Sequence, residues 1–371
     1  MGTVTLTYGN QPRKMVRDLV EETGALDSLR PYDKVMIKPN LVVSRHQWVG
    51  VDTDPRVIEA IVIELKERGI HRITVGDGSG GGQSATLALE ICGYTGLARK
   101  YDLDLIDLEK DRFTKLTVPI KGPFKELEVA GTVLESDCFI NVPVMKAHMQ
   151  AGITCSLKNL KGTMPGMMKR RFHGVDLHRA IAQLNSVLRP DLIVVDGLKG
   201  DLYNETGNTP VAMDRMLLGT NPVEMDSVVA DTLGYAPRDI PYICHCADEG
   251  LGTCDLDQIN IHALNQATTE ERFTPPPHYS RRFPCHISAE GVCCTCMGNL
   301  MFALERLKDM RLLKKKQVFM IGQKSRMPFS TSGDLTVSVG RCAAKLHSAD
   351  ITIPKCPPTA NEICENMIAA M

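Results

Sequence analysis

Short apolar runs that end in polar residues, each followed by a helical pattern, constrain the fold of this 371-residue chain most strongly. The clearest runs cover residues 34–39, 72–75, 138–142 and 192–196. Such continuous apolar runs are typical of strands that are buried on both faces of a parallel sheet. Helical spacing follows at 12–29, 55–68, 84–91 and 177–188. We therefore expect an α/β fold with an open, mostly parallel sheet that is flanked by helices.

A change of composition predicts two domains. Residues 236–284 become richer in proline and polar groups, and the run P-P-P-H-Y-S-R-R at 275–282 is the best candidate for a linker. We expect an α/β domain over 1–274 and a smaller, cysteine-rich α/β unit over 285–371. Strands at 317–321, 335–340 and 351–353 and a closing helix at 360–371 are predicted for the second unit.

Charge and hydropathy exclude some classes of partner. The formal net charge is −1, and the basic clusters at 169–171 and 314–316 are short, so we expect no binding to nucleic acid. No segment reaches the roughly 18 consecutive apolar residues of a membrane helix, and the N-terminus lacks the pattern of a signal peptide. The expected location is the cytoplasm, without a membrane partner.

Polar side chains gather where the predicted strands end. In open α/β sheets the carboxyl ends of the strands are where ligands bind. Lysines there would bind an anionic small molecule, amides would orient it, and a desolvated lysine or histidine would move a proton near neutral pH. The predicted catalytic residues are Lys146, His148 and Lys158. The predicted substrate-binding residues are Lys38, Asn40, Asp77, Ser79, Asn159, Asp196 and Asn204.

Seven of the thirteen cysteines lie in the last quarter of the chain. In a reducing compartment such a concentration favours a soft metal or an iron–sulfur cluster over disulfides. The predicted ligands are Cys293, Cys294, Cys296, Cys342 and Cys356, whereas Cys364 is predicted to be a core residue. Zinc is the alternative metal, although paired C-x-x-C units are missing. Cys244, Cys246 and Cys254 are either the ligands of a second metal site or small side chains that pack in the core.

Several motifs, in their order, resemble the bacterial and archaeal family catalogued as domain of unknown function 362. They are K-P-N-L, D-T-D-P-R-V-I-E-A-I, V-G-D-G-S-G, D-C-F-I-N-V-P-V-M-K-A-H, S-L-K-N-L-K-G, D-L-I-V-V-D-G and G-T-N-P-V-E-M-D-S-V. The resemblance covers roughly residues 30–255. It implies an α/β domain that is often found beside iron–sulfur modules.

The C-terminal segment is similar to a second group of proteins over a shorter stretch. G-R-C at 340–342 and I-P-K-C-P-P at 353–358 resemble the G-x-C and P-G-C-P-P patterns in small subunits of NADH:quinone oxidoreductase and nickel–iron hydrogenases. The resemblance implies a [4Fe–4S] cluster on a flavodoxin-like half-domain. Cys293 and Cys294 would match the early cysteine pair, Cys342 the third ligand and Cys356 the fourth. Lys355 stands where that pattern has glycine.

Three classes of function remain open at this point. The favoured class is an iron–sulfur oxidoreductase that passes electrons to or from an anionic small molecule, with a redox partner protein. The second is a lyase, racemase or ligase that acts on a carboxylate or phosphate and uses the cluster as a clasp or Lewis acid. The third is an electron carrier or maturation protein without catalysis. No flavin or nicotinamide fingerprint is present to name an organic cofactor.

Overall fold

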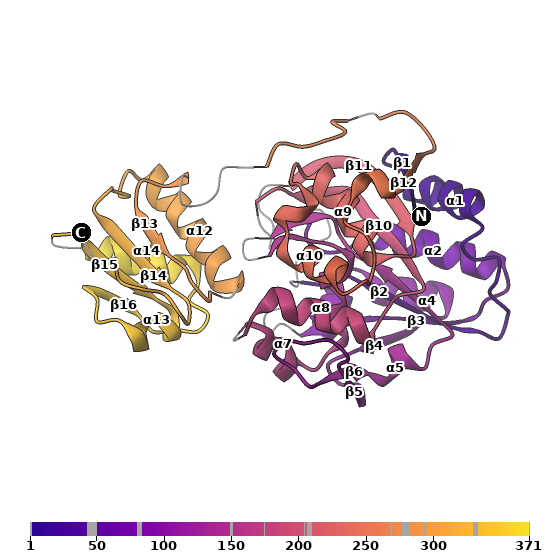
Figure 1. Ribbon diagram of the computed structural model, residues 1–371, viewed down its shortest axis with the longest axis horizontal. Helices are drawn as coiled ribbons and strands as arrows, with labels where there is room; N and C mark the ends of the chain where they lie inside the picture. Colours follow the sequence, from indigo (N-terminus) through magenta and orange to yellow (C-terminus); the bar gives the residue numbers. More distant parts are fainter. Residues whose placement is uncertain are drawn as a thin grey trace. The chain divides into compact units, whose positions relative to one another are not determined.

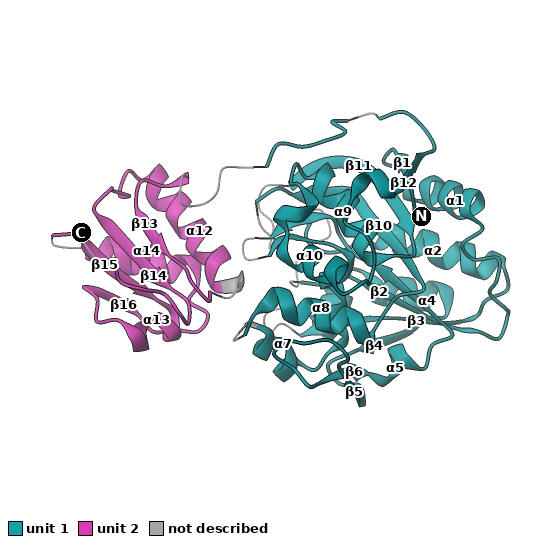
Figure 2. Cartoon of the chain, viewed as in Figure 1, with its two compact units in different colours: residues 1–275 teal, residues 276–371 magenta. Residues whose placement is uncertain are grey.

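The computed structural model describes most of the chain (Figure 1). The described residues are 2–42, 50–79, 84–148, 151–173, 175–203, 205, 210–267, 269–275, 282–292, 294–328 and 333–370, without the side chains of His173, Cys294 and Thr295. Two compact units divide the chain, Met1–Pro275 and Pro276–Met371, called unit 1 and unit 2 below (Figure 2).

Unit 1 is built on an eight-stranded sheet with the order β12-β1-β11-β10-β7-β2-β3-β4. Its strands are β1 (Thr3–Tyr8), β2 (Lys34–Pro39), β3 (Arg72–Asp77), β4 (Asp104–Asp107), β7 (Cys138–Val142), β10 (Leu192–Asp201), β11 (Pro210–Gly219) and β12 (Asn260–Ala263). The strands from β10 to β4 in this order run parallel, whereas β11 is antiparallel to both of its neighbours. The predicted α/β fold with a mostly parallel sheet is confirmed.

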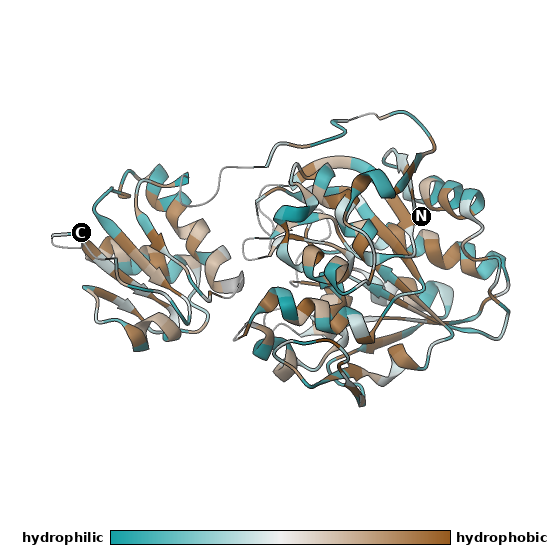
Figure 3. Cartoon of the chain, viewed as in Figure 1, coloured by the Kyte–Doolittle hydropathy of each residue, from teal (hydrophilic) through white to brown (hydrophobic). Residues whose placement is uncertain are grey.

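Helices cover both faces of this sheet (Figure 1). One face packs against α1 (Pro12–Thr23), α2 (Pro55–Glu67), α3 (Ala85–Ile91) and α4 (Tyr94–Tyr101), and the other against α8 (Leu177–Val187), α9 (Pro222–Thr232) and α10 (Pro241–Asp248). In β2, Val35 and Ile37 belong to the first core and Met36 to the second. Successive side chains of a strand alternate between the two faces of the sheet. A sheet that is covered by helices on both faces therefore needs strands that are apolar at every position. The brown strands in Figure 3 show this pattern.

Smaller elements complete unit 1. They are β5 (Phe113–Thr117), β6 (Glu126–Ala130), α5 (Gly131–Leu134), β8 (Lys146–His148), β9 (Gly152–Thr154), α6 (Ser156–Asn159) and α7 (Gly166–His173). A 3₁₀ turn at Leu160–Thr163 follows α6, and two more lie at Pro237–Asp239 and Leu256–Gln258. β5 pairs with β6, and β8 with β9, as antiparallel hairpins outside the main sheet.

One predicted boundary in unit 1 was wrong. The helix expected over 12–29 ends at Thr23, because Gly24 adopts φ 60° and its N–H donates to the carbonyl of Val20. A left-handed glycine of this kind is a common cap at the C-terminus of a helix.

Unit 2 holds a four-stranded parallel sheet with the order β13-β14-β15-β16. Its elements are β13 (His286–Ser288), α12 (Cys294–Asp309), β14 (Gln317–Ile321), β15 (Leu335–Val339), α13 (Gly340–Leu346), β16 (Ile351–Ile353) and α14 (Ala360–Ala369). Thr359 and Glu362 form a reciprocal capping box at the start of α14. Among the described residues, no helix has the length and apolar character of a membrane span.

Candidate functional site

A buried ion pair joins the ends of two neighbouring central strands. Lys38 Nζ lies 2.7 Å from Oδ1 of Asp77, and neither side chain is more than 2% exposed. Burial lowers the pKa of Lys38 and raises the pKa of Asp77, and the charge of each residue opposes the shift of the other. The N–H of Leu41 donates to Asp77 Oδ2 at 2.8 Å, which fixes the carboxylate against the segment after β2.

A chain of amides continues from this ion pair. Lys38 Nζ donates to Asn159 Oδ1 at 3.1 Å, and Asn159 Nδ2 donates to Asn141 Oδ1 at 2.8 Å. Asn141 in turn donates to the carbonyl and the hydroxyl of Ser156. β2, β7 and α6 are therefore tied together by a fully buried polar network, which is rigid when its members are satisfied.

Gly162 closes this network from one side. A Cβ at Gly162 would lie 2.0 Å from Asp77 Oδ1 and 2.7 Å from Lys38 Nζ, so no side chain fits there. The Gly162 carbonyl also accepts from the N–H of Gly78 at 3.0 Å. The glycine at the end of S-L-K-N-L-K-G thus allows backbone to approach the ion pair directly.

A second group of ionisable residues lies at the other side of α6. One carboxylate oxygen of Glu205, Oε2, lies 2.9 Å from His148 Nε2 and 2.8 Å from Lys158 Nζ. The N–H of Ala151 donates to His148 Nδ1 at 3.0 Å. Because Nδ1 accepts, the proton of the neutral ring is on Nε2, and His148 donates it to Glu205. Burial lowers the pKa of His148 to about 4, so the ring is neutral at pH 7.

Glu205 is the ionised member of this group. Burial opposes its charge, but His148 and Lys158 outweigh that effect and hold the pKa of Glu205 well below its usual range. Lys146, the first residue of β8, is fully buried nearby and donates to the carbonyl of Val51. Burial lowers the pKa of Lys146 to about 8. A lysine with such a pKa exchanges its proton close to neutral pH.

Asp226 of α9 holds α6 in place, and α6 carries residues of both the Lys38–Asp77 group and the His148–Glu205 group. Its Oδ1 accepts from the N–H of Ser156 at 2.7 Å, and its Oδ2 accepts from Leu157 N–H at 3.2 Å and from Tyr242 Oη at 3.2 Å. Asp226 therefore satisfies the first donors of α6, which carries Lys158 and Asn159 side by side.

We call these residues the strand-end site. Its members are Lys38, Asp77, Asn141, Lys146, His148, Lys158, Asn159 and Glu205. Lysines and carboxylates alternate in it, with Lys169 at its edge, where it contacts Glu109 and donates to the carbonyl of Ser79 at 2.8 Å. A buried set of coupled groups with shifted pKa values is typical of catalytic sites. Lysine and histidine side chains are groups that bind anions and transfer protons in proteins.

Most residues predicted from strand ends fall in or beside this site. The exceptions are Asp196 and Asn204. Asp196 accepts from the N–H groups of Asp54 and Leu198 at 2.8 and 3.1 Å, so it supports the turn before α2. Burial raises its pKa to about 7. Asn204 lies outside the described residues. Asn40 and Ser79 directly follow Pro39 and Gly78 at the strand ends.

Sequence reasoning missed Asn141, Glu205 and Asp226 as members or supports of the site. Asn141 is the polar residue inside an otherwise apolar strand, C-F-I-N-V, and that anomaly was a usable signal. Asp226 is a buried acid in a helix with many buried positions. Glu205 lies in a polar loop, where nothing in the sequence distinguishes it from its neighbours.

Three cysteines of unit 2 follow the carboxyl ends of its strands. Cys296 is on α12, Cys342 is on α13, and Cys356 lies in the segment before α14. The N–H of Arg341 donates to the carbonyl of Lys355 at 3.2 Å, which joins the start of α13 to that segment. A Cβ at Gly340 would lie 3.9 Å from Cys296 Sγ, so the start of α12 lies near the start of α13.

The described side chains alone do not complete a metal centre. Within the described part of the chain, no three His, Cys, Asp or Glu side chains are grouped to hold a metal ion. Cys293 and the side chain of Cys294 are outside that part. Thiolates are the usual ligands of iron–sulfur clusters, and Cys296, Cys342 and Cys356 supply that type of donor from three neighbouring segments.

Other cysteines are packing residues. Cys364 Sγ lies 3.6 Å from the carbonyl of Ala303, between α14 and α12, which confirms its predicted place in the core. Cys285 precedes β13 and so lies at the opposite edge of the sheet from Cys296. Cys246 and Cys254 are buried in the core of unit 1, and with Cys244 they form no metal group among the described residues.

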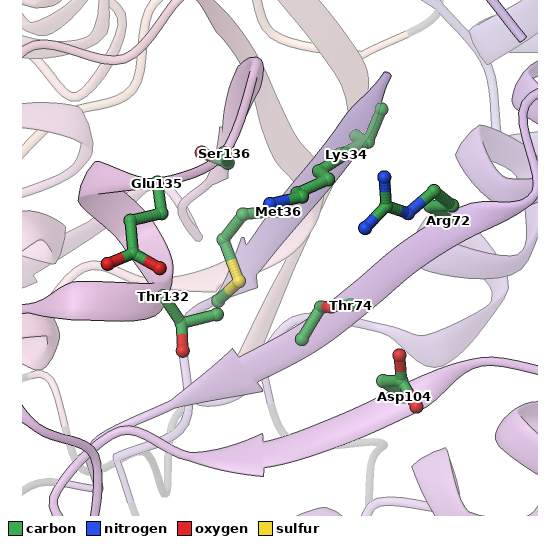
Figure 4. A pocket seen from close by; sticks show the side chains of 9 residues that line it. Lys34, Met36, Arg72, Thr74, Asp104, Thr132, Glu135 and Ser136 are labelled. Carbon is green, nitrogen blue, oxygen red and sulfur yellow. The ribbon is translucent and has the colours of Figure 1, made fainter. Parts of the chain in front are cut away.

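A cavity of about 150 Å³ lies at the other end of the large sheet (Figure 4). Its walls include Lys34, Arg72 and Asp104, which are the first residues of β2, β3 and β4. Lys34 and Arg72 are exposed, so their charges are solvated. This cavity is separate from the strand-end site, because parallel strands place their first and last residues at opposite edges.

The fold and the strand-end site define an α/β protein with a buried lysine–carboxylate centre. The chain belongs to the family described as "Domain of unknown function (DUF362)", whose model matches residues 35–231. The matched range includes every member of the strand-end site and Asp226.

Two further similarities were found. A thylakoid-associated protein of Synechocystis sp. is 29% identical over 249 residues, which cover 64% of this chain and 74% of that protein. The structure of the lactate racemase apoprotein from Thermoanaerobacterium thermosaccharolyticum matches with a TM-score of 0.34 and 14% identity, over 52% of this chain and 50% of that chain. This similarity spans about half of the solved chain.

Proposed function

We propose that unit 1 is the substrate-binding part of an enzyme that acts on a small anionic molecule, a carboxylate or a phosphate. The contact of Glu205 Oε2 with both His148 Nε2 and Lys158 Nζ carries this proposal. Two donors on different elements converge on one anionic oxygen, and charge-assisted hydrogen bonds of this kind bind carboxylate and phosphate groups strongly. A substrate anion would take the place of the Glu205 carboxylate.

His148 and Lys146 supply the proton chemistry of the proposed enzyme. The neutral ring of His148 holds its proton on Nε2 and presents it to the bound oxygen. Lys146, with its pKa of about 8, gives or takes a proton at little cost near neutral pH. Both side chains are buried, and removal of water strengthens their electrostatic effect on a bound substrate.

For unit 2 we propose an iron–sulfur cluster, [4Fe–4S] by the resemblance of its loops, held by Cys296, Cys342 and Cys356 with Cys293 or Cys294. When bound, such a cluster supplies one-electron redox chemistry. The favoured activity of the whole chain is then oxidation or reduction of the anion, with a redox partner protein as the source or acceptor of electrons. A non-catalytic electron carrier is the alternative if no anion binds.

Calorimetry of the full chain with inorganic phosphate tests anion binding. We expect Lys158→Gln to weaken phosphate binding about tenfold or more, since one charged hydrogen bond is lost. Glu205→Gln should strengthen it, because the competing carboxylate is gone. Lys115→Gln, which changes an exposed lysine of β5, is the matched control. Equal affinities in all four proteins would overturn the proposed anion site.

Iron and sulfide analysis of anaerobically purified protein tests the cluster. We expect about four iron and four sulfide per chain. Cys342→Ser and Cys356→Ser should each lose most of the iron, whereas the core variant Cys364→Ser should keep it. Stoichiometric zinc without sulfide would instead support the alternative metal, and full iron in both ligand variants would refute the ligand assignment.

A second candidate function is a non-redox lyase, racemase or ligase on the same anion. The observation that favours it is that the buried site holds Lys146, with a pKa of about 8, and the neutral ring of His148, which are proton-transfer groups that need no electrons. The two candidates differ in one measurement. If turnover of a substrate proceeds equally with the cluster oxidised and reduced, the non-redox function is correct.

A further inference from the structure

Two buried oxygen atoms that lack a hydrogen-bond donor lie beside the strand-end site. Among the described residues, four buried side-chain atoms have neither a hydrogen bond nor an ion pair: Asn40 Oδ1, Ser79 Oγ, His178 Nδ1 and Asn185 Oδ1. The first two belong to residues that follow two adjacent strands, β2 and β3, and both are oxygen atoms that can accept. Burying such an atom without a donor costs free energy, so a donor is missing from this place.

Asn40 and Ser79 follow the ends of neighbouring strands. β2 and β3 are parallel and in register, with Ile37 opposite Val75, and the polar residues follow where both strands end. Leu41, the residue after Asn40, donates to Asp77 Oδ2 at 2.8 Å. Ser79 follows Asp77 by two residues and is 1% exposed.

The neighbouring charges decide what kind of donor fits. Lys38 Nζ is 2.7 Å from Asp77 Oδ1, so the ion pair already supplies that oxygen with a donor. Lys169 Nζ is bound to the carbonyl of Ser79 at 2.8 Å. A metal cation would have to lie beside two ammonium groups, which Coulomb repulsion disfavours. Neutral hydroxyl groups donate hydrogen bonds without adding charge.

We propose that Asn40 and Ser79, called the notch below, bind hydroxyl groups of the substrate, so that the substrate is a hydroxylated anion such as a sugar acid or a sugar phosphate. The proposal rests on the proposed function, because His148 and Lys158 hold the anionic end. The notch adds selectivity: an analogue without hydroxyls leaves buried acceptors unpaired, and sites built this way reject such analogues strongly.

Two probes of equal charge and carbon number separate the hydroxyl contribution from anion binding. Calorimetry of the full chain compares sn-glycerol 3-phosphate with n-propyl phosphate. We expect the glycerol compound to bind about tenfold tighter or more. Ser79→Ala, and independently Asn40→Ala, should bring the affinity ratio close to one. Ser227→Ala, which removes a buried hydroxyl bonded to Val223 within α9, should preserve the ratio.

Each possible result supports or refutes the proposed hydroxyl notch. Equal binding of the two probes by the unchanged protein, with loss of both in Lys158→Gln, would refute the hydroxyl notch and leave the anion site intact. An unchanged ratio in folded Ser79→Ala and Asn40→Ala would mean that the orphaned oxygens hold only water, which also refutes the notch. Absence of binding by both probes at millimolar concentration would overturn the proposed function and the inference together.

Discussion

At the scale of residues, burial sets the chemistry of the strand-end site. A lysine on a protein surface is a charged ammonium at neutral pH. Inside this site, burial lowers the pKa of Lys146 to about 8, whereas the neighbouring charges lower the pKa of Glu205 and keep it ionised. Desolvation and neighbouring charge act on every group here, and their balance differs from one residue to the next. The roles assigned to His148, Lys146 and Lys158 follow from that balance.

The pH dependence of anion binding follows from Lys146. Its folded pKa of about 8 lies below the usual 10.5, so the ammonium form is lost as pH rises through about 8. Phosphate monoesters are dianions from about pH 7.5 to about 9.5, so the probe does not titrate there. We expect the Kd for n-propyl phosphate to rise up to about tenfold per pH unit above this pKa. Calorimetry across that range checks it.

The matched variant for this prediction is Lys146→Met, which has no proton to lose. Its affinity should be weak at every pH and should show no dependence on pH in the same range. If the Kd of the unchanged protein does not depend on pH in this range, anion binding does not depend on the protonation of Lys146.

Gly162 gives a stability prediction with a close control. Gly162→Ala places a methyl group 2.0 Å from Asp77 Oδ1, and we expect it to lower the free energy of unfolding by about 1–3 kcal/mol or more. Gly96 in α4 has open space around it, so Gly96→Ala should stabilise by up to about 1 kcal/mol through helix propensity. Urea denaturation measures both. Equal effects would contradict the close packing at Gly162.

At the scale of elements, α6 is the part on which the site depends. It is four residues long and could not be stable alone, since isolated short helices are marginal in water. Asp226 on α9 and the amide chain through Asn141 hold it in place. α6 then presents Lys158 to Glu205 and Asn159 to Lys38 from adjacent positions.

Removal of the acceptor on α9 should therefore weaken the site at a distance. Asp226→Ala leaves the N–H groups of Ser156 and Leu157 unpaired, and we expect about tenfold weaker phosphate binding. Asp231→Ala changes an acid on the same helix that contacts Arg272 at the surface, and it should bind phosphate normally. Normal binding by a folded Asp226→Ala protein would show that α6 needs no support from α9.

The elements also show how much of the fold could be predicted from the sequence. Strands such as Cys138–Val142 and Gln317–Ile321 were predicted to the residue, because each is an apolar run of strand length that is too short for a typical helix. The helix boundary at Thr23 was missed, because apolar spacing continues past the glycine that stops it. Glu205 was not predictable, since its role comes from a loop that meets His148 and Lys158 only in the folded chain.

At the scale of the whole molecule, each unit has a sheet of parallel or mostly parallel strands, and the candidate functional residues of both units follow the carboxyl ends of such strands. Unit 1 places lysines and carboxylates there, and unit 2 places cysteines there. The division of labour in the proposed enzyme follows: anion binding and proton transfer in unit 1, electrons from unit 2. Only the family of unit 1 is established, through residues 35–231.

The central claim is that the anion binds at the carboxyl ends of the strands, and diffraction locates an anion directly. Crystals of the full chain grown with selenate should give an anomalous peak within hydrogen-bond distance of Lys158 Nζ, with the Glu205 carboxylate displaced. A peak at the cavity beside Lys34 and Arg72 instead, with Glu205 still bound to Lys158, would contradict the account (Figure 4).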